Sequence, residues 1–358
     1  MPSSSVDTFL ASSIMIILAL SAMVGTSKLM APYMSDLASR DDDTRFQFLA
    51  SHLLLTTGTP TKWGQMKNTK PTSLGLAKAS ALQPYELDVD KVSRLNSENS
   101  YSLDYSDLWQ AFGVKDVSFQ VEIRPPFELS IESVSNSTQG TQTVYEFEVN
   151  ARKSGMPVSA SLSGYVAVRD FVNKTTASTS SNGAGTLMIG IPNSTNGTAV
   201  LLVFAQSTAN AQVVSFSAFA FGHNVPSPLP NLTFTRLSPL DYVLNASLFY
   251  DSVEVTKAQA FTFDHNSSLT VKAQGVQTVE YVIPRLLDAS TTVMVLTGFN
   301  GSTSFAEWVV YPQIPFQIGA DFSGSIAGSR IAVHSRIVTI NSALYEAVTR
   351  WGGLSDDV

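Results

Sequence analysis

Residues 8–27 read TFLASSIMIILALSAMVGTS, twenty positions without a formal charge. At about 1.5 Å of rise per residue, a helix of this length can cross a bilayer core of about 30 Å. The run therefore predicts a cleaved secretory signal, a membrane anchor, or a helix buried against copies of itself. The preceding residues, MPSSSVD, contain no Lys or Arg and include Asp7, which argues against a secretory signal.

Four residues of this region are candidates for contacts between subunits. Ser21 and Gly25 lie one helical turn apart and would let two helices approach closely, although small residues are also common in apolar helices. Asp7 falls in the predicted first turn, where the helix dipole favours a carboxylate; it is expected either to cap the helix or to pair with a neighbouring subunit's N-terminal amine. Pro32 removes a helical hydrogen bond, so a kink is expected near it.

The composition limits the class of protein. The chain has 358 residues, is 44% hydrophobic, and can bury a large core. Only 14% of its residues are charged, against about 25% in a typical soluble domain, so much of its surface is expected to be neutral and polar. A net charge of -7 argues against nucleic acid as a partner, and the absence of Cys excludes disulfides and thiolate metal sites.

Beyond the first helix the sequence is patterned for strands. Short helices are expected at 86–95 and 104–112, with Asp104 as a helix cap, and period-two alternation begins at Val117. The chain is therefore predicted to be an α+β protein: a long N-terminal helix, kinked near Pro32, then a mainly β head of one or two sandwich domains, one of them immunoglobulin-like. The predicted regions are 1–57 (assembly core or membrane anchor), 58–134 (helix-containing part of the head), 135–222 (immunoglobulin-like sandwich) and 223–358 (C-terminal β domain).

Eight Asn-X-Ser/Thr triplets mark candidate N-glycosylation sites, and all of them lie in the strand-patterned region. Their confinement to that region predicts a head exposed outside a cell and carrying N-linked glycans. A second feature agrees with this. Residues 175–235 include no Asp, Glu, Lys or Arg, where typical composition would place about fifteen, so glycans or neighbouring subunits are expected to cover this part. The candidate residues are Asn136, Asn173, Asn193, Asn196, Asn231, Asn245, Asn266 and Asn300.

Catalytic and metal-binding patterns are weak. The four histidines are scattered without metal-ligand spacing, and the sequence contains no glycine-rich phosphate loop and no GxSxG motif. Asp264-His265 could belong to a catalytic pair, but a turn beside Asn266 explains it more simply. No enzyme activity, metal or cofactor is predicted. The histidines are His52, His223, His265 and His334.

Three segments resemble those of archaeal type IV pilins and archaellin-like filament subunits. They are LLLTTGTPTKWGQ (53–65), GLAKASALQPYELDVDKVSRLN (75–96) and RIVTINSALYEAVTRWG (336–352). The likeness covers about the first 130 residues and the last 25, and its motifs are moderately specific. Asp7 is the fifth residue counted from Ser3, which matches the acidic residue that in the family faces a neighbour's N-terminus. The family's basic leader and processing site are absent.

The resemblance implies a subunit of an extracellular filament that inserts in the membrane as a precursor and then polymerises with copies of itself through its N-terminal helix. It implies roles in assembly for Asp7, Ser21, Gly25 and Pro32. The alternative is a monomeric, membrane-anchored surface adhesin or binding protein with the same head.

Overall fold

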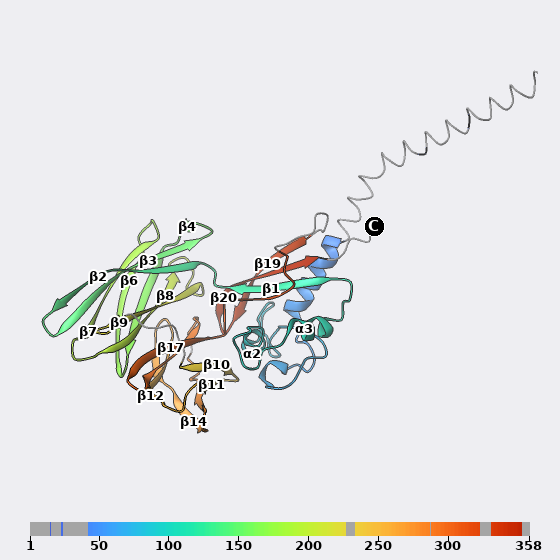
Figure 1. The fold of residues 1–358 in the computed structure, drawn as a ribbon. Helices are drawn as coiled ribbons and strands as arrows, with labels where there is room; N and C mark the ends of the chain where they lie inside the picture. The colour runs from blue at the N-terminus through green and yellow to red at the C-terminus, as the bar shows by residue number, and fades with distance from the viewer. Residues whose placement is uncertain are drawn as a thin grey trace, which may run out of the picture. The chain divides into compact units, whose positions relative to one another are not determined.

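Strand-forming residues dominate the part of the chain described by this computed structural model, which comprises residues 42–226, 233–286, 288–322 and 331–352 together with Met15 and Met23. The chain divides into two compact units, Met1–Ser51 and His52–Val358. In the first unit the described residues are helical. The second unit is built mainly of antiparallel strands (Figure 1).

The expected α+β class with a long N-terminal helix is wrong for the described residues, which are mostly β. The described chain begins with a helix over residues 42–55, about 21 Å long at 1.5 Å per residue. None of the described helices is both long and apolar enough to span a membrane. The sequence-based prediction gave too much weight to 8–27; apart from Met15 and Met23 this run lies outside the described residues, as does Pro32.

Short helical elements follow the first helix. The 3-10 turn η1 spans Trp63–Gln65, α2 spans Val89–Ser93, and α3 spans Tyr105–Phe112. The last two confirm the predicted helices. Asp104 occupies the N-cap position of α3 without a side-chain cap bond, whereas the carboxylate of Asp88 caps α2 by accepting from the backbone of Asp90 and Lys91.

The strands form five antiparallel sheets, each named here after one of its members. The β20 sheet joins segments far apart in the sequence, since β1 pairs with both β18 and β20. Its order is β18 (Phe316–Gly319), β1 (Ser118–Arg124), β20 (Ala343–Gly352) and β19 (Ile331–Ile340). Its aromatic core stacks Phe119 on Trp351, with ring centroids 5.4 Å apart.

Two sheets face each other across residues 128–223. The β3 sheet contains β2 (Glu128–Gln139), β3 (Gln142–Lys153), β4 (Met156–Pro157) and β7 (Ala184–Pro192). The β8 sheet has the order β6 (Phe171–Ser178), β5 (Ala160–Val168), β8 (Gly197–Ser207) and β9 (Val214–His223). Phe147, Leu187 and Leu201 belong to the core between them. The immunoglobulin-like assignment of this region stays a prediction.

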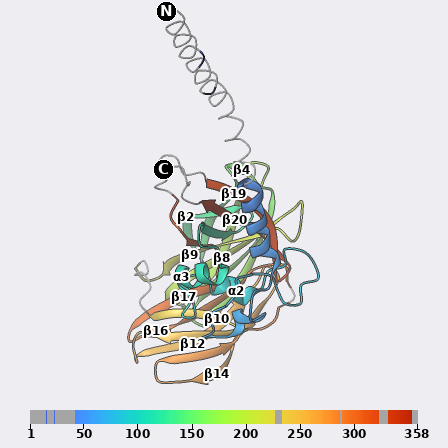
Figure 2. The ribbon, with the colours of Figure 1, turned by 90° about the vertical axis from the view of Figure 1, so that its right-hand side faces the viewer.

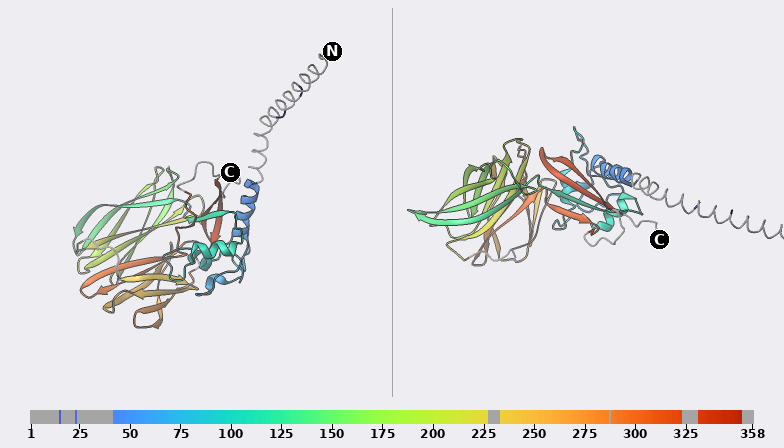
Figure 3. Two further views of the ribbon diagram at one scale, coloured as in Figure 1. Left: turned by 45° about the vertical axis from the view of Figure 1, so that its right-hand side comes forward. Right: turned by 90° about the horizontal axis from the view of Figure 1, so that it is seen from above.

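Two further sheets follow in the chain, with orange strands in Figure 2. The β11 sheet has the order β10 (Phe234–Leu240), β11 (Val243–Leu248), β15 (Thr278–Val282) and β14 (Thr270–Gln274). The β16 sheet has the order β13 (Asn266–Ser268), β12 (Val253–Phe261), β16 (Thr292–Asn300) and β17 (Thr303–Tyr311). Figure 3 gives two further views of these sheets.

Strand β8, which lies within the charge-free stretch 175–235, is buried on both faces. Ala199, Leu201 and Val203 point into the core shared with the β3 sheet. The alternate residues Leu202 and Phe204 belong to a second core, shared with Val293 and Val295 of the β16 sheet. Because successive side chains of a strand point to opposite faces, a strand between two cores reads as a continuous apolar run. The cover here is another sheet of the same chain.

Replacing Leu202 with Ala is expected to lower the free energy of unfolding by about 2–5 kcal/mol, because it opens a cavity in a fully buried core. Met188→Ala, at a side chain 59% exposed on β7, should change it by less than about 0.5 kcal/mol. Urea unfolding followed by fluorescence measures both. Equal effects would show that the β8 and β16 sheets do not pack tightly.

Candidate functional site

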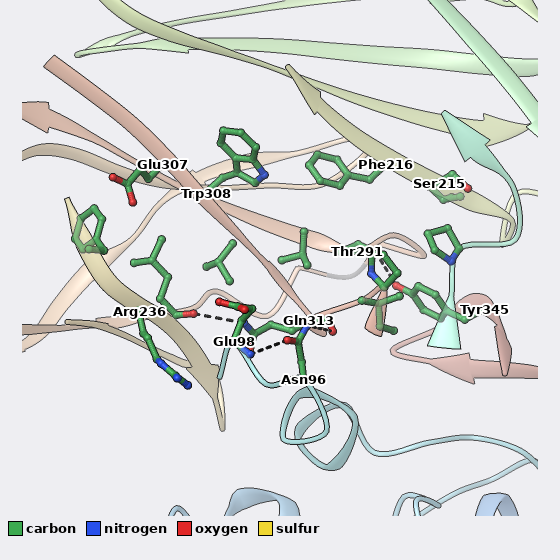
Figure 4. A pocket seen from close by; sticks show the side chains of 18 of the residues that line it. Asn96, Glu98, Ser215, Phe216, Arg236, Thr291, Glu307, Trp308, Gln313 and Tyr345 are labelled. Atoms are coloured by element: carbon green, nitrogen blue, oxygen red, sulfur yellow. Dashed lines mark hydrogen bonds between the residues drawn. The ribbon is translucent and has the colours of Figure 1, made fainter. Parts of the chain in front are cut away.

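A cleft of about 470 Å³ lies where the β8, β16 and β11 sheets end side by side (Figure 4). Its volume falls within the roughly 300–1,000 Å³ range of ligand pockets. Strands β9, β17 and β10 line it, and each is the edge strand of its sheet. We call it the three-edge cleft. Its aromatic residues are Phe216, Phe234, Trp308 and Tyr345.

Each edge strand contributes consecutive residues to the lining: 214–216, 234–237 and 307–310. A cavity that touches one face of a sheet meets every second residue, because side chains alternate between faces. Trp308 packs in the layer between the β8 and β16 sheets. Consecutive lining residues fit a cleft that meets these strands at an edge or an end and not one that lies against a single face.

The charged groups of the cleft are nearly balanced. Glu307 is 5% exposed, and its carboxylate accepts from the backbone N–H of Thr233 at 3.1 Å; burial raises its pKa. Arg236 is exposed and donates to the carbonyls of Ser97 and Asn99 at 2.9 and 3.1 Å. It thereby holds the loop that carries the exposed Glu98, so the mouth presents one cation beside one anion.

An amide network forms the floor of the cleft. The side chain of Asn96 donates to the carbonyl of Gln313 at 3.0 Å, and the backbone N–H of Glu98 donates to Asn96 Oδ1 at 2.9 Å (Figure 4). Asn99 Nδ2 donates to Gln313 Oε1 and to the carbonyl of Pro239. These bonds connect the loop after α2 with the segment after β17, so the floor is ordered without a ligand.

Helix α2 anchors that loop through buried charged groups. Asp90 is 1% exposed and accepts from the Tyr311 hydroxyl at 2.6 Å and from the backbone N–H of Asp241 at 2.7 Å. Burial raises the pKa of Asp90 to about 6, and the neighbouring Asp88 adds to the rise. Lys91 Nζ donates to the carbonyls of Thr57 and Ala77 at 2.8 and 2.7 Å. Burial lowers the pKa of Lys91 to about 8.

Arg94 completes this arrangement. Its Nη1 donates to the carbonyls of Trp63, Met66 and Thr69 at 2.6–2.9 Å, and its Nε donates to the carbonyl of Tyr101 at 2.8 Å. One guanidinium thus satisfies four carbonyls of two loops. Gly64 allows η1 to approach α2, because a Cβ there would lie 2.5 Å from the Lys91 backbone nitrogen.

The residues predicted for assembly, Asp7, Ser21, Gly25 and Pro32, lie outside the described residues, as does Asn231. The structure therefore does not bring them to a site.

Seven candidate glycosylation residues are described, and they differ in environment. Asn136, Asn196 and Asn266 are exposed. The side-chain nitrogens of Asn173 and Asn245 donate to Gly190 O and to Tyr101 Oη, at 3.1 and 3.0 Å. The nitrogen of Asn193 approaches Gly140 O at 3.4 Å, and Asn300 Oδ1 accepts from Ser252. Glycosylation modifies the side-chain nitrogen, so the exposed residues are the more accessible ones.

The histidines have structural surroundings. Buried His223 lies between Tyr145 Oη, 2.8 Å from Nδ1, and the carbonyl of Pro192, 3.0 Å from Nε2. Both ring nitrogens therefore have a protein partner, which fixes the orientation of the ring. Asp264-His265 lies in a turn, as predicted, where the backbone of Thr262 donates to the carbonyl of His265 at 2.8 Å. Within the described ranges, no group of three or more His, Cys, Asp or Glu could hold a metal ion.

The three-edge cleft escaped sequence-based prediction. Glu98, Arg236 and Trp308 lie far apart in the sequence, and no local motif links them. Among the Trp residues, Trp63 and Trp351 are fully buried, whereas Trp308 is half-buried in the cleft lining.

Comparisons with known proteins assign no family. No family model and no curated protein matches the chain. Among solved structures, it is similar to HBP35 of Porphyromonas gingivalis, with 11% sequence identity and a TM-score of 0.21. The match covers 52% of this chain and 64% of that chain, which is less than two thirds of its length. A similarity at this level assigns neither a fold nor a function.

The resemblance to archaeal type IV pilins is contradicted. The family's defining element is a long N-terminal helix, and the described residues contain none; they are nearly all β with short helices. The segments that suggested the likeness, such as 75–96 and 336–352, form α2 with its loops and the β19–β20 hairpin. The predictions of a pilin, a helical polymer and a transmembrane helix are therefore wrong for the described residues. Short apolar segments of this kind also occur in the core of a mainly β protein.

Asp90→Asn is expected to change the pH dependence of stability. A carboxyl whose folded-state pKa lies above its unfolded value of 3.8 contributes stability that is fully present below that value and lost as pH rises through about 6. Between about pH 4 and about pH 7, the wild type should therefore lose about 2 kcal/mol relative to Asp90→Asn.

Urea unfolding across this pH range provides the measurement. The exposed Asp264→Asn serves as the control and should follow the wild-type curve. Parallel curves for wild type and Asp90→Asn would contradict the buried, proton-linked role of Asp90.

Proposed function

We propose that this chain is an extracellular, N-glycosylated β-sheet protein that binds a partner at the cell surface through its three-edge cleft. The observation that carries the proposal is the cleft itself: a cavity of about 470 Å³ with aromatic walls, an ordered amide floor and two oppositely charged groups at its mouth. A concave, largely apolar site with a few convergent polar groups is the usual form of a ligand site.

Several properties of the cleft support binding rather than catalysis. Glu307, the most buried carboxylate of the lining, already accepts a hydrogen bond from Thr233. The described lining residues include no His, Cys or Lys that could act as a base or nucleophile. The amides of Asn96 and Gln313 bond to each other's segment and thus shape the site. The sequence suggested a filament subunit or a surface binding protein, and the proposal keeps the second of these.

The extracellular location rests on separate support. The candidate N-glycosylation triplets lie on the β region, and three of their asparagines are exposed there. A surface with few charges is compatible with a coat of glycans. The absence of Cys leaves redox compartment undecided, so the glycans are the property to measure.

In protein isolated from its native cells, Asn136, Asn196 and Asn266 are expected to carry glycans, and Asn173 and Asn245 to be unmodified because their side-chain nitrogens are hydrogen-bonded. Peptide mass spectrometry after protease treatment of intact cells measures location and modification together. Unmodified peptides at all three exposed sites, or release only after lysis, would contradict the extracellular assignment.

Filling the cleft is expected to abolish binding to a cell surface. Thr235→Trp places an indole at an exposed lining position, and Thr270→Trp makes the same change at an exposed position on β14, outside the lining. Beads coated with full-length protein are incubated with envelopes of the native cells. Wild type and Thr270→Trp should adhere, and Thr235→Trp should adhere at least about tenfold less. Equal adhesion by all three would show that the cleft is not the binding site.

A further inference from the structure

We propose that the ligand of the three-edge cleft is an extended peptide segment that adds as a strand to the free edge of β17. This inference rests on the proposed function, because it names the ligand class of the same site. It predicts recognition through main-chain hydrogen bonds along β17, with side chains of the peptide entering the layers on either side of the β16 sheet.

The free edge of β17 is the first step. Among the described strands, β17 pairs only with β16, over the whole of Thr303–Tyr311. In an antiparallel ladder each strand uses alternate residues toward one neighbour, so the remaining N–H and C=O groups of β17 point away from β16. Residues 307–310 of this strand line the cleft, so an extended segment bound there would lie beside that edge.

The lined part of β17 limits the length of a bound segment. Four consecutive residues of β17 span about 13 Å at about 3.3 Å per residue. A segment of four to five extended residues therefore matches the lined part of the edge.

The third step is the chemistry of the walls on either side of β17. Phe216 and Trp308 both pack in the layer between the β8 and β16 sheets, and Figure 4 shows them near each other on one side of the cleft. On the other side, Phe234 packs edge-to-face on Phe305 with centroids 5.5 Å apart, and Leu237 lines the cavity. Successive side chains of an added strand point to opposite faces, so both would enter apolar layers. A peptide with consecutive apolar residues fits this arrangement.

The charges of the cleft also limit the class of ligand. Arg236 and Glu98 stand together at the mouth, and the buried Glu307 is held by Thr233, so the cleft has no excess of positive charge. A phosphate-rich ligand or other polyanion would need such an excess. The cleft instead suits a neutral segment. A neutral sugar could use the aromatic rings, but it would not require the main-chain edge.

The test uses end-capped, fluorescein-labelled pentapeptides with three central apolar residues, measured by fluorescence polarisation on full-length protein. Binding should be lost at least about tenfold in Thr235→Trp and kept in Thr270→Trp. The tightest peptide is then methylated on one backbone nitrogen at a time. Alternate positions should lose at least about tenfold in affinity and the intervening ones about twofold or less, because only alternate N–H groups face β17.

The outcomes separate this inference from the proposed function. If no peptide binds, or if methylation shows no alternation, strand addition is overturned. If a panel of neutral glycans then binds wild type and Thr270→Trp but not Thr235→Trp, the cleft remains the binding site and its ligand is a sugar. If Thr235→Trp also leaves bead adhesion unchanged, the proposed function falls as well.

Discussion

The buried guanidinium of Arg94 holds together the irregular part of this protein. Segments 63–69 and 97–101 have turn-like backbone bonds and lie outside the sheets, so side-chain donors that bridge them fix how they pack. Arg94 supplies donors to four of their carbonyls, while Lys91 and Asp90 on the same short helix bind other loops and the end of β17. A five-residue helix cannot be stable by itself, so α2 depends on these contacts as much as they depend on it.

This polar anchor also shapes the three-edge cleft. The residues directly after α2 form the floor of the three-edge cleft, and the bond from Ser93 Oγ to the backbone of Gln313 positions the opposite side. The anchor includes a carboxyl that favours its protonated state in the folded protein more than a free Asp does. Burial of the Asp90 carboxylate therefore lowers stability at neutral pH, while its hydrogen bonds fix how the loops pack on the sheets.

The stacking of sheets accounts for the rest of the architecture. Strand β8 is covered on both sides and is apolar on both faces, and the β16 sheet shares one of those cores. Three sheets that stop side by side leave three strand edges together. Natural proteins usually cover such edges or place charged side chains on them, because unpaired main-chain groups can pair with strands of other chains. Here residues of three edge strands line one cleft.

The sequence by itself predicted the strand-rich composition, helices α2 and α3, the position of β1 and the turn at Asp264-His265, because each depends on local pattern. The fold class and family predicted from the sequence were wrong. An apolar N-terminal run and short similar segments indicate which residues avoid water, but they do not indicate how the chain folds in three dimensions. The sequence-based prediction attributed the charge-free stretch to glycans or neighbours, whereas β8 is buried between two cores. Only the tertiary structure brought Glu98, Arg236 and Trp308 into one cleft, since strand pairing over long sequence separations places edges side by side without leaving a local signal.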